Sequence, residues 1–460
     1  MFPLSLSHFI NEGIMTCSTF LSLLLFLSCG VSPVPPQGDT QQTQQSGLSD
    51  SLLLDRVQRE CFNYFWDGGE TVSGLARERI HSDGVYPQKD QDVITSGGAG
   101  FGILAMLVAA ERSFVPREAV VARLEQSVSF LENADRFHGA WAHWMYNDGH
   151  VKPFSPKDNG GDIIETAYLA QGLLCARQYF RQGNTREQAL AARMDALWRG
   201  IEWNWYRGAD QEHVLFWHWS PQYGWEMNFR IRGYNECLIA YVLAASSPTY
   251  AIPPEVYHEG WASSGAFVGG PTQYGYTLAL KHQGSPEYGG PLFWAHYTFL
   301  GLDPRSLKDQ YADYWEHNVS HVMIDYHYCV ENPHGYAGYG PDCWGLTSSY
   351  SPKGYSGHKP EEDLGVISPT AALSSFPYAP DEAMAALRHF YGDLGGQVIG
   401  VYGPYDAFRI ADDWFPQRYL AIDQGPIVSM IENYRSGLLW HLFMSCEEVQ
   451  SGLTKLGFSY

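Results

Sequence analysis

Six segments of this chain have the pattern of helices that are apolar on nearly every side, and they constrain the fold more than any other feature. They show helical rather than alternating periodicity, and none reaches the length of an apolar membrane span. A helix that is apolar on every side must be buried on every side, so these segments must lie inside the molecule. They cover residues 97–110, 162–180, 235–246, 290–301, 369–375 and 425–441.

Amphipathic segments alternate with the apolar ones, and the clearest is PREAVVARLEQSVSFLENADRF at 116–137. Buried helices interleaved with amphipathic ones predict an inner ring wrapped by an outer ring. We therefore predict an all-α fold, an (α/α)6 toroid of six inner and six outer helices, forming one domain over residues 50–460. A solenoid of short helical repeats is the alternative, although the chain shows no consistent repeat. The other amphipathic segments are 51–66, 185–206, 307–330 and 380–391.

Charge and composition disfavour several classes of partner. The 460 residues include 50 acidic and 29 basic side chains, for a net charge of −21, which disfavours nucleic acid and anionic membrane surfaces. Charged residues make up only 17% of the chain and aromatic residues 15%, which fits a neutral ligand in a ring-lined cleft. The sequence contains no GxSxG, HExxH, P-loop or dinucleotide-binding signature. We expect a monomer with no metal and no cofactor.

The eight cysteines form no CxxC pair and no zinc-ligand spacing. Cys175 and Cys237 lie inside apolar helical patterns, where a free buried thiol is the ordinary interpretation. Cys329 and Cys343 could pair across a loop, and the sequence leaves this question open.

The N-terminus has the pattern of a bacterial lipoprotein signal. The short apolar stretch TFLSLLLFLSC ends in Leu-Ser-Cys-Gly, which predicts a signal peptide over residues 1–28 and lipidation of Cys29. Residues 29–49 are rich in Pro, Gln and Ser and predict a disordered tether. The n-region has no Lys or Arg, and Met15 is an alternative start. We expect a secreted protein in the periplasm or on the outer membrane, attached only by this lipid; a soluble protein with an apolar first helix is the alternative.

Carboxylates stand where three of the inner helices begin. The loops that enter the inner helices of such a ring converge at one end, and the helix N-termini there direct partial positive charge into the same funnel. An acid in a first turn is commonly only a cap. A carboxylate ahead of a fully apolar helix, however, needs a hydrogen-bonded network or a ligand. The candidates are Asp158, Asp162 and Glu165 in DNGGDIIETAY, Glu236 in RGYNE, and Asp412, Asp413 and Asp423 in the last such segment.

Aromatic segments surround these acids in the sequence. Sugar rings present apolar C–H faces that stack on Trp and Tyr, while their hydroxyl groups need fixed polar partners. Acids that converge in an aromatic funnel suit cleavage of a glycosidic bond, which requires a proton donor and a second carboxylate. Plain core packing is the alternative for about half of these rings. The candidate binding residues are Trp141, His143, Trp144, Trp217, Trp219, Tyr223, Trp225, Arg230, Arg232 and Tyr234.

Three motifs resemble the bacterial glycoamylase-like proteins, and glycoside hydrolase family 144 in particular. They are DNGGDIIETAYL, WEMNFRIRGYNECLIAYVLAASSPTY and IDQGPIVSMIENYRSG, and the resemblance extends from about residue 50 to the end. It implies an (α/α)6 fold and inverting cleavage of β-1,2-glucan, endo or exo. It also implies that Glu236 is the general acid and Asp423 the base, with Asp158, Asp162 and Glu165 as active-site acids.

Other functions stay open at this point. The same toroid could hydrolyse an α-glucan, or act as a sugar lyase or epimerase. A lyase for acidic polysaccharides would need a basic cleft, which the net charge of −21 disfavours. The non-enzymatic alternative is a lipid-anchored protein that binds glycans without cleaving them.

Overall fold

The computed structural model describes residues 47–460, all of which belong to one compact unit. The predicted signal peptide, Cys29, Met15 and nearly all of the tether lie outside the described residues. Twelve α-helices, α2 to α13, occupy the described part of the chain, together with short 3-10 and π-helical turns and short strands. Among these helices none is both long and apolar enough to cross a membrane.

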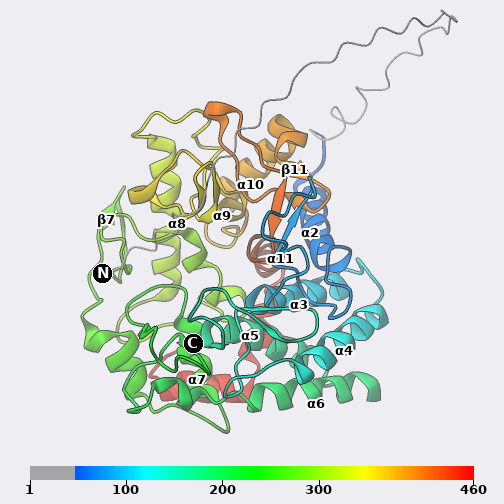
Figure 1. Cartoon of the computed structure of the whole chain (residues 1–460). Coiled ribbons are helices and arrows are strands. Elements are labelled where there is room, and N and C mark those ends of the chain that lie inside the picture. The colour runs from blue at the N-terminus through cyan, green and yellow to red at the C-terminus, as the bar shows by residue number, and fades with distance from the viewer. Residues whose placement is uncertain (1–46) are drawn as a thin grey trace, which may run out of the picture. The chain divides into compact units, whose positions relative to one another are not determined.

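The inner helices are formed by the fully apolar segments, and almost every side chain in them is buried. α5 packs against α3 and α7, and α11 packs against α3 and α9, so the ring is built from sequence-distant neighbours. Figure 1 shows α11 and α3 near the middle of the unit. The inner elements are α3 (Ser96–Glu111), α5 (Ile163–Phe180), α7 (Leu238–Ser246), two 3-10 turns (Leu292–Ala295 and Thr298–Leu300), α9 (Pro369–Leu373) and α11 (Ala421–Arg435).

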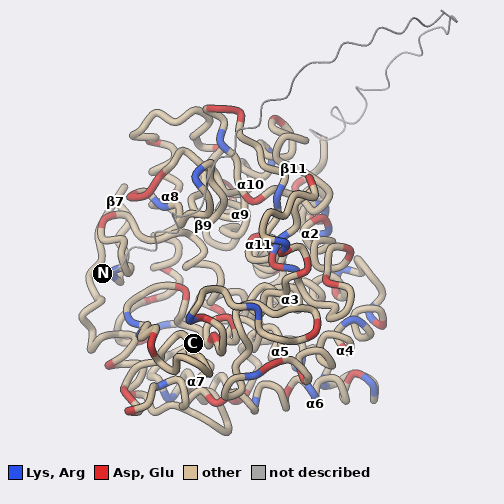
Figure 2. The backbone as a smooth tube through the Cα atoms, in the orientation of Figure 1, with Lys and Arg blue, Asp and Glu red and all other residues tan. Residues whose placement is uncertain are grey.

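The outer elements alternate with the inner ones along the chain, which confirms the (α/α)6 toroid. They bury one face and leave the other charged; the blue and red of α4 and α6 in Figure 2 illustrate this. α12 (Leu438–Met444) and α13 (Glu447–Lys455) follow the ring and pack against α5 and α7 respectively. The outer elements are α2 (Asp50–Trp66), α4 (Arg117–Asn133), α6 (Thr185–Arg199), a π-helical turn (Val256–Trp261), α8 (Tyr314–Glu331) and α10 (Pro380–His389).

The predicted helix over 290–301 was wrong, because the segment forms only the two 3-10 turns. Its carbonyl groups bond to side chains of neighbouring elements instead of to an α-helical ladder. Gln171 donates to the carbonyl of Tyr297 at 3.1 Å, and Trp440 Nε1 donates to that of Phe299 at 2.7 Å. These long-range donors are invisible in the local pattern.

Other predicted helices have different limits. The one over 185–206 ends as α6 at Arg199 and is followed by a 3-10 turn over Trp203–Arg207. The segment predicted as one helix over 425–441 divides into α11 and α12 at Gly437, whose φ of 70° belongs to the left-handed region that favours glycine. The helix predicted from residue 307 starts as α8 at Tyr314, where the Asp313 side chain accepts hydrogen bonds from the first-turn N–H groups.

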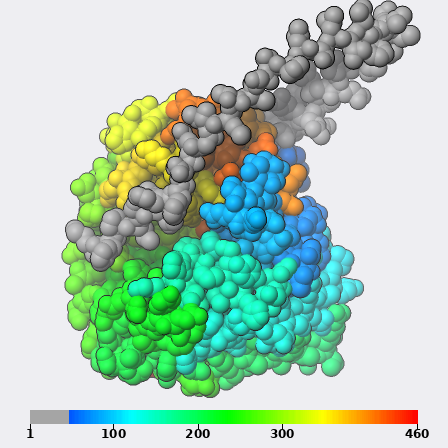
Figure 3. All heavy atoms as spheres, viewed as in Figure 1, coloured from blue at the N-terminus to red at the C-terminus, as the bar shows by residue number. Residues whose placement is uncertain are grey.

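Short strands in the loops tie together the starts of the inner helices. β5 pairs with β6, and this register sets Asp162 opposite His218. The loops before α3 and α5, light blue and cyan in Figure 3, lie on the face turned to the viewer. The pairs are β1 (Arg79–His81) with β13 (Arg418–Leu420), β2 (Ile94–Thr95) with β3 (Trp144–Met145) and β4 (Val151–Lys152), β5 (Gly161–Asp162) with β6 (His218–Trp219), β7 (Thr272–Gln273) with β8 (Tyr276–Thr277), β9 (Ser348–Ser351) with β10 (Gly354–Gly357), and β11 (Ile399–Gly400) with β12 (Gly403–Pro404).

Much of the aromatic excess lies in the core rather than in a cleft. Cys329 and Cys343, which could have paired, are both buried free thiols, as are the other cysteines of the described residues. The largest fully buried side chains include Trp141, Trp198, Trp203, Trp261, Trp344 and Trp440.

Candidate active site

Asp162 is the central acid of the first group of candidates, and donors surround its carboxylate. Its Oδ1 accepts the N–H groups of Ile164 and Glu165, both at 2.9 Å, and so caps α5. Its Oδ2 accepts His143 Nδ1 at 3.0 Å and Trp217 Nε1 at 3.1 Å. Burial raises the pKa of Asp162, but the hydrogen bond and positive charge of His143 outweigh burial and hold the pKa below its usual value. Asp162 is therefore ionised at neutral pH.

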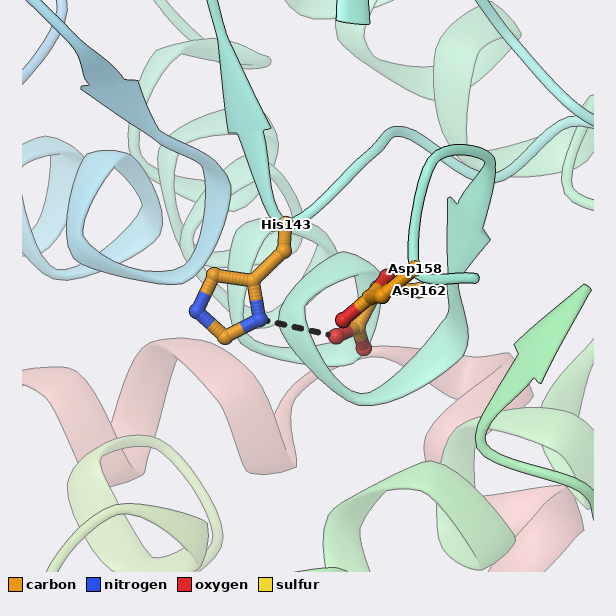
Figure 4. A group of neighbouring side chains, drawn as sticks. All are labelled: His143, Asp158 and Asp162. Carbon is orange, nitrogen blue, oxygen red and sulfur yellow. Dashed lines mark hydrogen bonds and ion pairs between the residues drawn. The ribbon is translucent and has the colours of Figure 1, made fainter. Parts of the chain in front are cut away.

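His143 is the side-chain partner of Asp162 in this network, and Figure 4 draws their contact as a dashed line. Burial lowers the pKa of His143, but the surrounding carboxylates of Glu165, Asp162 and Asp158 raise it to about 10. The ring is thus an imidazolium at neutral pH. It balances the charge of Asp162 in a region where an unpaired anion would be costly.

Asp158 and His218 complete the network. His218 Nε2 lies 3.3 Å from Asp158 Oδ2 and 3.5 Å from Asp162 Oδ2. Burial lowers the pKa of His218 to about 4, so its ring is neutral. Burial, together with the charge of Asp162, raises the pKa of Asp158 to about 7. His218 was not among the predicted site residues, although it lies in an aromatic segment; the β5–β6 register brings it here.

The ligand atoms of His143, Asp158 and Asp162 lie within 4.8 Å of one another, close enough to hold a metal ion. Both Asp162 oxygens, however, already accept N–H donors, and a protonated His143 cannot bind a cation. The donor set thus fits a hydrogen-bonded ion pair better than a cation site. A second cluster of possible ligands lies at the surface and consists of Asp342, His389 and Asp393.

Glu165 extends the network toward α3. Its Oε2 accepts the N–H of Gly97 at 2.8 Å, and a Cβ at residue 97 would lie only 2.4 Å from the same oxygen. The contact therefore requires glycine at the start of α3. Burial and the charge of Asp162 raise the pKa of Glu165 to about 7, against the opposing effect of His143.

Glu236 lies in the turn just before α7, after Gly233, whose φ of 79° belongs to the left-handed region that favours glycine. Its carbonyl accepts Thr298 Oγ1 at 2.7 Å and the Tyr168 hydroxyl at 3.3 Å, which fixes the backbone. Within residues 47–460, its partly buried carboxyl group has no hydrogen bond to another residue. Burial and the charge of Glu165 raise the pKa of Glu236 to about 7.

Asp423 lies in the first turn of α11 and is only 2% exposed. In the described part of the chain, no N–H or hydroxyl donor bonds to either of its carboxylate oxygens. Burial and the nearby charge of Asp406 raise the pKa of Asp423 well above its usual value. Asp412 and Asp413, the neighbouring candidates in the sequence, are both exposed, and Asp412 forms a surface ion pair with Arg409.

Several predicted binding residues lie at or near the network. Trp144 packs edge-on against His143, with ring centroids 5.7 Å apart, and Trp217 holds Asp162. Trp219 is partly buried and packs against Trp205, whereas Tyr223 is 40% exposed.

Five predicted binding residues are occupied by structural contacts. Trp141 is fully buried and its Nε1 donates to a main-chain carbonyl. Tyr234 is also fully buried and donates to Asn318 at 3.0 Å. These two rings are core residues, because a side chain without exposed surface cannot stack on a sugar. The others are Trp225, which packs on Phe216, Arg230, which forms a two-point ion pair with Glu212, and Arg232, which donates to the carbonyl of Glu259.

Known proteins resemble this chain over most of its length. Residues 228–447 match the family model named Glycoamylase. An endo-β-1,2-glucanase from Chitinophaga pinensis, solved with sophorotriose and glucose, is 60% identical, with a TM-score of 0.89 over 90% of this chain and 99% of that chain. The exo-β-1,2-glucooligosaccharide sophorohydrolase of Parabacteroides distasonis is 44% identical over 89% of this chain, which spans 58% of that relative's length.

A more distant structure shares the fold alone. The endo-β-1,2-glucanase of Talaromyces funiculosus is 12% identical, with a TM-score of 0.61 over 90% of this chain and 92% of its own. At 60% identity over nearly the whole of the Chitinophaga enzyme, the family is established. This chain belongs to the glycoamylase-like family of glycoside hydrolases, as its resemblance to glycoside hydrolase family 144 predicted.

Proposed function

We propose that the protein hydrolyses β-1,2-glucan by an inverting mechanism in which Glu236 is the general acid. One observation carries this assignment: Glu236 is a partly buried carboxyl group with no hydrogen bond to another residue in the described chain, and its pKa is raised to about 7. It therefore holds a proton near neutral pH and is free to donate it. The names of the Chitinophaga and Parabacteroides relatives support β-1,2-glucan as the substrate.

In the proposed reaction, Glu236 protonates the glycosidic oxygen as the bond to the anomeric carbon breaks. A water molecule attacks that carbon from the opposite face, and its proton passes to Asp423. Because neither oxygen of Asp423 is exposed, we infer that the proton travels through intervening water. Each turnover consumes one water, and the two carboxyl groups return to their starting states by exchanging one proton with solvent.

The His143–Asp162 ion pair would position the sugar instead of reacting with it. Both groups are already paired with each other, and Asp162 accepts four strong hydrogen bonds. Asp158 and Glu165, whose pKa values are both raised to about 7, have oxygens left to accept sugar hydroxyl groups. A neutral glucan suits this acidic surface because it brings no anion to repel.

An α-glucan is the second candidate substrate, because the matching family model carries the name Glycoamylase. Product analysis on linear β-1,2-, β-1,3- and α-1,4-glucans separates the two. Sophorose or longer β-1,2-oligosaccharides are the expected products. Hydrolysis of the α-1,4-glucan alone would contradict the proposal, and binding without hydrolysis of any glucan would favour a glycan-binding protein.

The roles are tested by isosteric variants. Glu236→Gln cannot donate a proton, and Asp423→Asn cannot accept one, so each should lower kcat by about 10²- to 10⁴-fold with little change in KM. Asp412→Asn, on the exposed surface, is the matched control and should keep wild-type activity. NMR of the first-formed anomer tests inversion. Undiminished hydrolysis by Glu236→Gln would remove it from the acid role.

We also propose that the protein is a monomeric lipoprotein, periplasmic or attached to the outer membrane through Cys29. The sequence Leu-Ser-Cys-Gly after an apolar stretch supports this, as does the Pro- and Gln-rich segment that follows. Labelling of cells with a palmitate analogue should mark the wild type but not Cys29→Ala. Equal labelling of both would contradict lipidation at this residue.

A further inference from the structure

Two phenylalanines, Phe154 and Phe229, differ from all the others in the described chain because their side chains are exposed. Their exposed fractions are 43% and 42%, and every other phenylalanine within residues 47–460 is buried or partly buried. A single exposed apolar side chain needs no special explanation. These two are not scattered, however, since each packs on a ring that donates to Asp162. Neither was among the binding residues predicted from the sequence.

Phe154 lies on His143, the first of the two rings that donate to Asp162 Oδ2. The two ring centroids are 4.2 Å apart, and Phe154 also packs edge-on against Trp144 at 4.7 Å. Its main-chain N–H donates to the carbonyl of Asp158 at 2.9 Å, so the ring and the Asp158 carboxyl group belong to one tight turn. One proline directly precedes Phe154 and another follows after one residue, which restricts the backbone of this turn.

Phe229 lies on Trp217, the second ring that donates to the same oxygen of Asp162. The ring centroids are 5.3 Å apart, and the carbonyl of Phe229 accepts the main-chain N–H of Trp217 at 3.0 Å. Phe154 comes from the loop between β4 and β5, and Phe229 from the loop between β6 and α7. Two loops thus bring an exposed phenyl ring to the two donors of one carboxylate oxygen.

We propose that Phe154 and Phe229 are substrate-binding residues, each of which stacks on the C–H face of a separate glucose unit of the β-1,2-glucan chain. This inference rests on the proposed function. A phenyl ring has no polar atom, so it offers a sugar face apolar contact area and no hydrogen bond. The Asp158 carboxyl group, on the same turn as Phe154, supplies an acceptor for a hydroxyl group at the edge of that sugar.

The groups beside the two rings suit a neutral sugar better than other ligands that bind aromatic surfaces. A purely apolar ligand would bury the neighbouring carboxyl groups without partners. An anion would be repelled by Asp162, which is ionised at neutral pH, and a cation by the imidazolium of His143, on which Phe154 lies. A pyranose ring meets both requirements, since it joins an apolar face to an edge of hydroxyl groups.

The experiment measures kcat and KM on a linear β-1,2-glucan oligosaccharide for wild type and for variants of both phenylalanines. Phe154→Ala and Phe229→Ala should each raise KM by about tenfold and change kcat by less than about threefold, because a stacked ring contributes binding and no chemistry. The two factors should multiply to about 100-fold in the double variant, since the rings bind separate glucose units.

Two further substitutions separate stacking from simple apolar packing. Phe154→Leu and Phe229→Leu keep apolar volume without a flat face, so they should recover only part of the lost affinity. Phe154→Tyr and Phe229→Tyr keep the ring and should recover most of it. The tyrosine variant should therefore bind better than the leucine variant at each position. This comparison also decides the matter if an alanine variant does not fold.

Tyr434→Ala is the matched control. Tyr434 is 45% exposed and packs on Phe376, much as the two phenylalanines pack on their own partner rings. It lies in the last turn of α11, at the opposite end of that helix from Asp423. Its truncation removes a comparable exposed ring far from the proposed site, so kcat and KM should both keep their wild-type values.

An unchanged KM in both alanine variants, or full recovery by leucine, would overturn the inference. A lower kcat with an unchanged KM in Phe154→Ala, together with a shifted NMR titration of His143, would also overturn it and leave Phe154 as a packing residue. A wild type that hydrolyses no β-1,2-glucan would contradict the proposed function instead. Calorimetry with the same oligosaccharide then still tests the rings: affinity about tenfold weaker in each alanine variant supports them, and equal affinities or no binding by wild type overturns them.

Discussion

The two buried acid groups of this site differ in how many donors surround them. Asp162 has four N–H donors, one of which is the protonated His143, and the pKa of Asp162 lies below its usual value. The carboxyl group of Asp423 is equally buried but accepts no N–H or hydroxyl donor within residues 47–460, and its pKa is raised. Burial alone therefore does not decide the pKa of a carboxyl group in this protein. The number of hydrogen-bond donors and the charges around the group decide it as well.

The difference separates two uses of the same side chain. A carboxylate saturated with donors is a fixed anion that holds neighbouring groups in place. A carboxyl group without donors gains and loses its proton closer to neutral pH, which is what acid–base chemistry requires. Glu236 is close to this state, because the only donor to its carboxyl group in the described chain is its own main-chain N–H, and both residues lie at the starts of inner helices.

The largest loss of stability should follow from replacing the Asp162 carboxylate, which only accepts hydrogen bonds, with an amide that also donates them. In Asp162→Asn, an amide NH₂ replaces one oxygen, so a donor must face either the His143 and Trp217 donors or the first-turn N–H groups of α5. His143 also loses its counter-ion, and breaking a buried pair in this way costs about 3–5 kcal/mol. Urea denaturation measures the loss. A destabilisation below about 1 kcal/mol would show that the network is not a structural unit.

The surroundings of Asp162, whose carboxylate has four donors, were easier to predict from the sequence than those of the donor-free carboxyl group of Asp423. Asp162 precedes an apolar helix by one residue, which is a local capping pattern, and its role as N-cap can be predicted from that alone. The hydrogen bond of Asp406 cannot be predicted in this way, because its donor, the main-chain N–H of Tyr350, lies 56 residues away in the sequence. His218 was missed for the same reason.

The overall fold was predictable because burial on all sides is a local property of each inner helix. Local patterns failed to predict the structure of residues 292–300. Side chains of other elements, those of Gln171 and Trp440, bond to main-chain carbonyl groups there in place of α-helical hydrogen bonds. Local patterns also failed for Trp141 and Tyr234, since a ring in a core and a ring in a cleft have the same sequence pattern.

A smaller change in stability, of opposite sign, should follow from replacing the donor-free carboxyl group of Asp423 with a neutral amide. A carboxyl group whose folded pKa is raised stabilises the protein fully below its unfolded pKa near 4, and this contribution is lost as pH rises through the folded pKa. Asp423→Asn removes that loss, so its stability relative to wild type should be higher at pH 8 than at pH 5, while its kcat falls as proposed above. Denaturation at pH 5 and 8 gives the comparison. A variant equally destabilised at both pH values would contradict the raised pKa of Asp423.

His143 should show the complementary dependence. The folded pKa of His143 is raised to about 10, so its ion pair stabilises the protein below the unfolded pKa near 6.5 and is lost as pH rises toward 10. His143→Gln should therefore cost most at pH 6 and progressively less toward pH 10, with a maximum of a few kcal/mol. NMR titration of the imidazole in wild type is the direct measurement. A midpoint near 6.5 would show that the surrounding acids do not hold its proton.

The smallest loss of stability should come from replacing His218, the partner of Asp158. Asp158 lies between Asp162, which has four donors, and Asp423, whose carboxyl group has none. The only side-chain partner of Asp158 in the described chain is His218 Nε2, at 3.3 Å, near the long end of hydrogen-bond distances. His218→Phe keeps the ring but removes that donor, so the loss of stability should stay below about 1 kcal/mol. Without this donor, the carboxyl group of Asp158 would have no side-chain hydrogen bond, like that of Asp423, and its pKa should rise above its present value of about 7. Glucan binding at pH 7 should weaken if the ionised oxygens of Asp158 accept sugar hydroxyl groups. Calorimetry with an inactive Glu236→Gln background, with and without His218→Phe, isolates this effect, and equal affinities would assign Asp158 to the scaffold together with Asp162.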